Sequence, residues 1–202
     1  MNQRHLACMA ICLPVATLLP GVAHAHLMNT GFGPFYDGVA HLVISPDNLL
    51  GAVGLALLAG LSGASFGRTL LLFLPAAWLL GGVIGLQFDQ EVILTLWSTC
   101  SFLLVGLLVA LDRQLPRTLF AVLATLLGLL HGFCNGTAMS AAGGGLLALF
   151  GISTTVFVIV TLLAALVIRL SPAWARLAVR VAGSWIASVG LLMIGWMLRG
   201  NG

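Results

Sequence analysis

Six long apolar segments with very short polar interruptions fill almost all of the chain after its first forty residues. Charged residues make up only 6% of the 202 residues and hydrophobic residues 60%, whereas a soluble domain carries about 25% charged residues. A surface this poor in charge is expected to face lipid. Because only helices and closed barrels satisfy the backbone in lipid, and alternating strand patterns are absent, the sequence predicts helices.

Each apolar segment is close to the about 20 residues that a membrane-spanning helix needs. The predicted fold is therefore an all-α, polytopic bundle of six transmembrane helices. We expect the helices near residues 41–63, 68–86, 92–111, 118–136, 146–168 and 174–198. No connecting segment is long enough for a soluble catalytic domain and no nucleotide-binding loop is present, so we do not expect an enzyme. The small net charge of +3 argues against nucleic acid as a partner.

The first 25 residues have the pattern of a cleaved signal peptide. Arg4 gives a positive start, residues 6–19 are apolar, and residues 23–25 read Ala-His-Ala, a small-x-small cleavage site. Cleavage there would make His26 the first residue of a transmembrane domain over residues 26–202. The alternative is an uncut first membrane helix, although the apolar run is short for a span.

An exported N-terminus fixes the direction in which the predicted helices run. Threading six helices from the outside places Asp37, Asp47, Asp89, Glu91 and Arg199 outside. The arginines placed inside are Arg68, Arg113, Arg117, Arg169, Arg176 and Arg180. This agrees with the excess of basic residues that membrane proteins show on the cytoplasmic side. We therefore expect a multi-pass membrane protein, embedded in the lipid bilayer with its mature N-terminus outside.

Polar residues within an apolar segment are costly, so each one indicates a functional site. His131 lies deep in the fourth segment, and Cys134 and Asn135 follow it at spacings of three and four, on the same side of a helix. Imidazole, thiol and amide groups suit a borderline transition metal. The alternative is a buried histidine that is hydrogen-bonded to a neighbouring helix.

A second group of polar residues lies near the outer start of the first segment. Asp37 and His41 are four residues apart and share a face if the helix already begins there. They form either a metal-binding pair, a pair in which the carboxylate fixes the ring tautomer, or an interfacial cap. Asp47 is interpreted as the N-cap of a helix that begins at Asn48. His26, as a mature N-terminus, would chelate a metal through its amino group and ring, or else be an incidental residue at a chain end.

Gly128, Gly132 and Gly136 recur every four residues on the segment that carries His131. Small residues at this spacing allow two membrane helices to approach closely. We expect them to be packing residues that hold His131 close to a partner helix.

These residues resemble the HupE/UreJ family of bacterial membrane proteins, which is linked to nickel supply for hydrogenase and urease. The resemblance covers essentially the whole mature chain. It rests on the six-helix layout, on His26, on Gly-Phe at residues 31–32, on the stretch 37–41, and on His-Gly at residues 131–132 with Gly136. It implies a permease of the bacterial inner (cytoplasmic) membrane for a divalent transition-metal ion, nickel or cobalt, with no tightly bound cofactor.

The chain departs from the family pattern at four positions. Ala40 stands where the family has an aspartate directly before its histidine, and a further upstream histidine would fall around Pro34. In the fourth segment, Asn135 replaces a second histidine and Ala138 stands at a glutamate position. The alternative is a non-transporting accessory protein for the maturation of hydrogenase, urease or another metalloenzyme. The sequence also leaves open whether the chain forms a homo-oligomer or binds a maturation partner.

Overall fold

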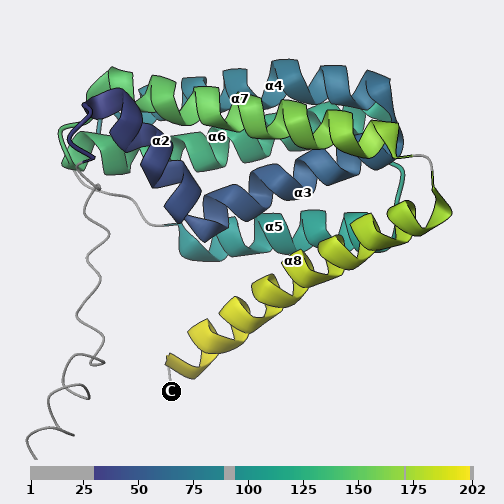
Figure 1. The fold of residues 1–202 in the computed structure, drawn as a ribbon. Coiled ribbons are helices and arrows are strands. Elements are labelled where there is room, and N and C mark those ends of the chain that lie inside the picture. The colour runs from purple at the N-terminus through teal and green to yellow at the C-terminus, as the bar shows by residue number, and fades with distance from the viewer. Residues whose placement is uncertain (1–29, 89–93, 171, 201–202) are drawn as a thin grey trace, which may run out of the picture.

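The computed structural model describes residues 30–88, 94–170 and 172–200, which form helices joined by short connections, with no strand among them (Figure 1). The helices in chain order are α2 (Pro34–Ile44), α3 (Pro46–Ser62), α4 (Ala64–Gly85), α5 (Thr95–Ala110), α6 (Arg117–Ala141), α7 (Gly145–Arg169) and α8 (Ala173–Gly200). The all-helical fold is confirmed for this part of the chain. The predicted signal peptide, residues 1–25, lies outside the described residues.

The prediction of one continuous first helix over residues 41–63 is wrong. The chain forms two helices there, α2 and α3, which are bent by 76° relative to each other. Ser45 between them is extended, with φ −94° and ψ 95°, because the ring of Pro46 disfavours helical backbone in the residue before it. Pro46 itself fits the first position of α3. A backbone N–H at that position would have no acceptor within the helix, so the lack of one in proline breaks no helical hydrogen bond.

The same break corrects the interpretation of Asp47. Ser45 is the N-cap residue of α3, and Asp47 lies in the first turn rather than before it. A carboxylate in the first turn still favours the helix, because it lies near the positive end of the helix dipole.

Length and composition qualify four helices of the described residues as membrane spans: α4, α6, α7 and the part of α8 over Trp174–Arg199. The bent pair α2 and α3 qualifies together as one broken span or as a re-entrant pair. Helix α5 has 16 residues, which cover about 24 Å at the helical rise per residue, less than the about 30 Å of a hydrocarbon core. The chain is a multi-pass membrane protein, and the count of six spans stays a prediction.

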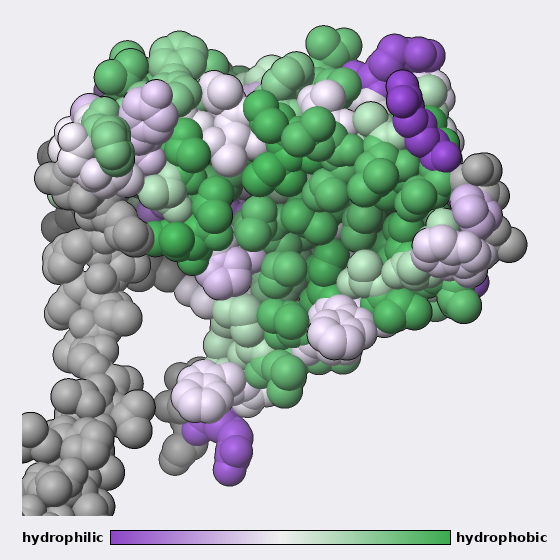
Figure 2. All heavy atoms as spheres, in the orientation of Figure 1, coloured by the Kyte–Doolittle hydropathy of each residue, from purple (hydrophilic) through white to green (hydrophobic). Residues whose placement is uncertain are grey.

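Helix α3 lies at the centre of the bundle, in contact with α4, α5 and α7. Its residues Leu55, Ala56 and Leu58 are buried. The outer helices instead expose large apolar side chains such as Leu72 and Trp185, and apolar residues cover much of the face seen in Figure 2. A continuous exposed apolar surface of this kind is typical of contact with a membrane.

Helices α4 and α6 pack with their backbones unusually close. A Cβ atom added at Gly132 would collide with the carbonyl oxygen of Trp78, and one at Gly136 with that of Gly82. The approach is reciprocal, since a Cβ atom at Gly81 would collide with the carbonyl oxygen of Leu129. Glycine at these positions therefore lets the backbones touch, as small residues do between membrane helices.

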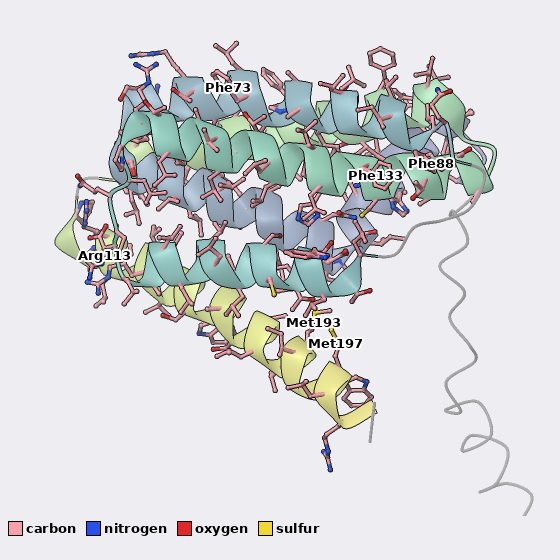
Figure 3. The ribbon with its side chains drawn as sticks, turned by 180° about the vertical axis from the view of Figure 1, so that it is seen from behind. Phe73, Phe88, Arg113, Phe133, Met193 and Met197 are labelled. Carbon is pink, nitrogen blue, oxygen red and sulfur yellow. The ribbon has the colours of Figure 1, made fainter. Side chains whose placement is uncertain are left out.

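Arginine side chains bind the ends of neighbouring helices at one end of the bundle. Arg176 makes a two-point contact with Asp112, with Nε–Oδ2 at 2.7 Å and Nη2–Oδ1 at 2.8 Å, and Arg180 donates to the carbonyl of Ala110. Figure 3 labels Arg113 at this end. Arg199 belongs to the last turn of α8, at the end that diverges from the bundle in Figure 1. The placement of the arginine end inside the cell stays a prediction.

Candidate functional site

Five polar side chains from four helices meet inside the bundle, and we refer to them as the polar cluster: His41 of α2, Asn48 of α3, Ser101 of α5, and His131 and Asn135 of α6. His41 Nε2 lies 3.0 Å from Asn135 Oδ1, which also accepts from Asn48 Nδ2 at 3.3 Å. Asn48 Oδ1 lies 2.9 Å from His131 Nδ1, and Ser101 Oγ lies 2.9 Å from His131 Nε2. Residues more than 80 positions apart in the sequence are thus joined in one hydrogen-bonded chain.

The backbone of α6 sets the direction of these hydrogen bonds. Asn135 Nδ2 donates to the carbonyl oxygen of His131 at 2.8 Å, and a carbonyl can only accept. The Oδ1 atom of Asn135 must therefore accept from His41 and from Asn48. The Oδ1 atom of Asn48 then accepts from His131, so His131 carries a proton on Nδ1 and, as a neutral ring, a lone pair on Nε2.

The hydroxyl of Ser101 has two acceptors for one proton. It lies 2.9 Å from Nε2 of His131 and 2.7 Å from the carbonyl oxygen of Ser98. A serine hydroxyl is a single donor that rotates to suit its surroundings. Ser101 can therefore bond either acceptor but not both at full strength.

The ring of His131 is held from its face as well as from its edge. The Trp78 indole stacks on it, with ring centroids 5.4 Å apart and planes 17° from parallel. On the α3 side, a Cβ atom added at Gly51 would lie 3.2 Å from Nε2 of His131. Stacking fixes the plane of the ring, and the missing side chain of Gly51 lets α3 lie close to Nε2.

Burial increases along the polar cluster from α2 inward. His41 is partly buried, whereas His131 and Asn135 are each 1% exposed. None of the five side chains is a carboxylate or a permanent cation. Their mutual hydrogen bonds offset the cost of removing them from water, which for each unpaired buried group is about 1–3 kcal/mol.

Helix α2, which carries His41, packs closely on α7 at two glycines. A Cβ atom at Gly38 of α2 would collide with the carbonyl oxygen of Ala148, and one at Gly151 of α7 would collide with that of Phe35. Close packing of α2 on α7, together with the bend at Ser45, directs His41 back toward α6. The Ser45 hydroxyl donates to the carbonyl of His41 at 2.6 Å and closes the end of α2.

The structure brings together three of the residues predicted as metal ligands, His41, His131 and Asn135. Asp37 accepts from both the backbone N–H and the hydroxyl of Thr30, at 2.7 and 2.6 Å, so its Oδ1 atom holds the segment before α2. Cys134 is partly buried on α6 and forms no disulfide with the other cysteine of the described residues.

The remaining predicted ligand, His26, lies outside the described residues, as do Asp89 and Glu91. Within the described ranges, no three or more histidine, cysteine, aspartate or glutamate side chains come together as a metal site. Any ion at the polar cluster would therefore need amide or hydroxyl oxygens beside the imidazoles.

Sequence reasoning missed Asn48, Ser101, Trp78 and Gly51. The sequence predicts Asn48 only as the start of a helix and gives no prediction for Ser101. The available signal was that both are polar residues in apolar segments, where an unpaired polar group is costly. Nothing in the sequence indicates that Trp78 faces His131, because the contact depends on how α4 and α6 pack.

Residues 14–193 match the family model described as HupE / UreJ protein. The matched range covers every helix of the described residues except the last turns of α8. Comparison with curated proteins and with solved structures gave no match.

Proposed function

The chain belongs to the HupE/UreJ family, and from this premise we propose that it is a membrane permease for a divalent transition-metal ion, nickel or cobalt. The observation that carries the proposal is the polar cluster, a chain of buried imidazole, amide and hydroxyl groups in the middle of an apolar bundle. Buried polar residues in membrane helices are costly and mark the paths of ions and substrates.

The position of the polar cluster beside a broken helix supports the proposal. His41 precedes the bend at Ser45 and Asn48 follows it, so the break holds one side chain of the cluster on each side. Discontinuous helices form the binding sites of many secondary transporters, because their ends leave backbone groups to interact with the cargo.

The chemistry of the polar cluster suits a loosely held dication. Imidazole nitrogens favour nickel, cobalt and similar metals over magnesium or calcium, which prefer oxygen ligands. A cluster without a carboxylate leaves the charge of a dication uncompensated in a medium of low dielectric, which weakens binding. A transport site must bind strongly enough to admit the ion and weakly enough to release it.

The increase in burial from His41 to His131 suggests a route for the ion. The ion would first meet the partly buried His41 and then pass to the fully buried His131, with Asn135 between them. In the proposed topology, α2 lies at the outer face of the bacterial inner membrane and the arginine end lies in the cytoplasm. The predicted Asp37–His41 pair and the predicted His26 chelate belong to the same outer entrance.

Uptake of metal by purified protein in lipid vesicles tests the proposal. Vesicles that contain the wild-type chain are expected to accumulate nickel and cobalt faster than protein-free vesicles, with little uptake of magnesium. The test variant is His41→Ala, which removes the first imidazole on the proposed route and is expected to reduce the rate of metal uptake. Wild-type vesicles that take up neither metal would refute transport by the chain alone.

A non-transporting accessory role in metalloenzyme maturation is the second candidate. It is favoured by the lack, among the described residues, of three close histidine, cysteine or acidic side chains. Under this role, the wild-type vesicles would accumulate no metal, whereas loss of the chain in cells would still lower the activity of a nickel enzyme at saturating nickel.

A further inference from the structure

Most of the surroundings of the His131 ring are already occupied. Trp78 stacks on one face, and Nδ1 is bonded to Asn48. The remaining ring nitrogen, Nε2, points toward Ser101 of α5. An ion that meets this ring must therefore approach in the ring plane, at Nε2.

Gly51 of α3 lies close to this edge of the ring and has no side chain. The three atoms nearest to a Cβ atom built there all belong to His131, with Nε2 at 3.2 Å, Cε1 at 3.7 Å and Cδ2 at 3.8 Å. Gly51 is buried, so its α-carbon borders the ring inside the bundle and not at the lipid face. Any side chain at position 51 would crowd Nε2.

Ser101 can change its hydrogen bond without giving up its proton. With its hydroxyl turned to Nε2 of His131, it occupies the lone pair of the ring. With its hydroxyl turned to the carbonyl oxygen of Ser98, 2.7 Å away, it exposes an oxygen lone pair on the Nε2 side. The rotation exchanges one acceptor for another, so its cost is small compared with leaving a hydroxyl unpaired.

Resting on the proposed transport function, we propose that the ion binds between Nε2 of His131 and Oγ of Ser101, beside Gly51. When the ion arrives, the Ser101 hydroxyl turns to Ser98 and keeps its proton. The nitrogen lone pair and the hydroxyl oxygen then both face the ion. Ser101 is thus a ligand residue of the transport site on α5, a helix that carries none of the residues quoted for the family resemblance.

Replacement of Ser101 by cysteine gives this site a spectroscopic signature. A thiolate is a strong ligand for cobalt and nickel, and its bond to Co²⁺ produces a charge-transfer band in the near ultraviolet. Purified Ser101→Cys protein titrated with cobalt chloride is expected to gain such a band, which His131→Ala in the same chain should abolish. The matched control is Ser153→Cys, because Ser153 is a buried serine of α7 outside the polar cluster. The unchanged chain gives the baseline contributed by its native cysteines.

Gly51→Ala crowds Nε2 of His131 and so tests the site independently of any new ligand. It is expected to weaken cobalt binding 10–100-fold, the range typical of changes next to a metal ligand. Gly67→Ala is the matched control, because its Cβ atom would meet only the tip of Ile168, at 3.3 Å. Ser101→Thr should keep cobalt binding, because it keeps the hydroxyl, and Ser101→Ala should weaken it.

The outcomes separate this inference from the proposed function. A wild-type chain that transports cobalt, with no added band in Ser101→Cys and unchanged binding in Gly51→Ala, would overturn the Ser101 site and leave the permease intact. A wild-type chain that neither binds nor transports cobalt or nickel would overturn both.

Discussion

The indole of Trp78 stacks on the imidazole of His131, with ring centroids 5.4 Å apart and ring planes 17° from parallel. This contact joins α4 to α6 at the level of the polar cluster. It depends on the glycine contacts of the same two helices, because Gly132 lies against the backbone of Trp78 itself. The glycine repeat thus has a direct effect on the site, since it sets the distance between the two rings.

Trp78 should report the binding of an ion at His131. It is 1% exposed, whereas the other tryptophans of the described residues are exposed, Trp97 at 65% and Trp196 at 81% among them. Paramagnetic nickel at His131 is expected to quench the emission of the stacked indole. The quenching should be lost in Trp78→Phe and kept in Trp196→Phe, as measured by fluorescence during a nickel chloride titration. Equal quenching in both variants would place the ion elsewhere.

The α4–α6 interface should tolerate no side chain at Gly132. In Gly132→Ala, the new Cβ atom meets the backbone of Trp78, which cannot move without separating the helices. Overpacking of this kind costs about 1–3 kcal/mol, so we expect a lower Tm in detergent. Gly195→Ala is the control, because nothing lies within 4 Å of its added Cβ atom, and its Tm should stay the same or rise. Equal Tm values for the two variants would contradict the close packing of α4 and α6.

Asn48 should control how tightly the ion is held. Asn48→Asp keeps an acceptor for Nδ1 of His131 and adds a negative charge beside a neutral cluster. Because the carboxylate compensates the charge of a dication, we expect a lower KM for nickel uptake together with a slower maximum rate. Asn48→Leu leaves the Nδ1 proton of His131 without an acceptor and should reduce stability by about 1–3 kcal/mol. A KM in Asn48→Asp equal to that of the wild type would argue against an ion at the cluster.

Several parts of the site could be predicted from the sequence. His41 and His131 stand out because a histidine in an apolar segment is rare, and Asn135 shares a helix face with His131. The glycine repeat and the gathering of arginines at helix ends are local patterns. Each of these features needs only the residue type and its spacing along one helix.

The rest required the packing of helices that are distant in sequence. The bond between Asn48 and His131 joins residues 83 positions apart, and no spacing rule relates them. The break at Ser45 had a local signal in Pro46, but the apolar pattern continues across it and favoured a single helix. Asp37 bonds the preceding Thr30, a contact that depends on how the chain enters α2.

The direction of the chain across the membrane can be tested by labelling. After all four native cysteines (Cys8, Cys12, Cys100 and Cys134) are replaced by serine, Arg113→Cys and Arg199→Cys place one thiol at each end of the bundle. With the N-terminus outside, a membrane-impermeant maleimide should label Arg199→Cys in intact spheroplasts, and Arg113→Cys only after permeabilisation. The opposite pattern would reverse the proposed topology.

The initial rate of nickel uptake into vesicles that contain His131→Ala tests whether the polar cluster is the transport site. The matched control is Thr125→Ala on the same helix, because Thr125 bonds the carbonyl of Ala121 within α6 and lies outside the cluster. We predict that His131→Ala falls to the rate of protein-free vesicles, whereas Thr125→Ala keeps the wild-type rate. A His131→Ala protein that is folded and takes up nickel at the wild-type rate would contradict transport through the polar cluster.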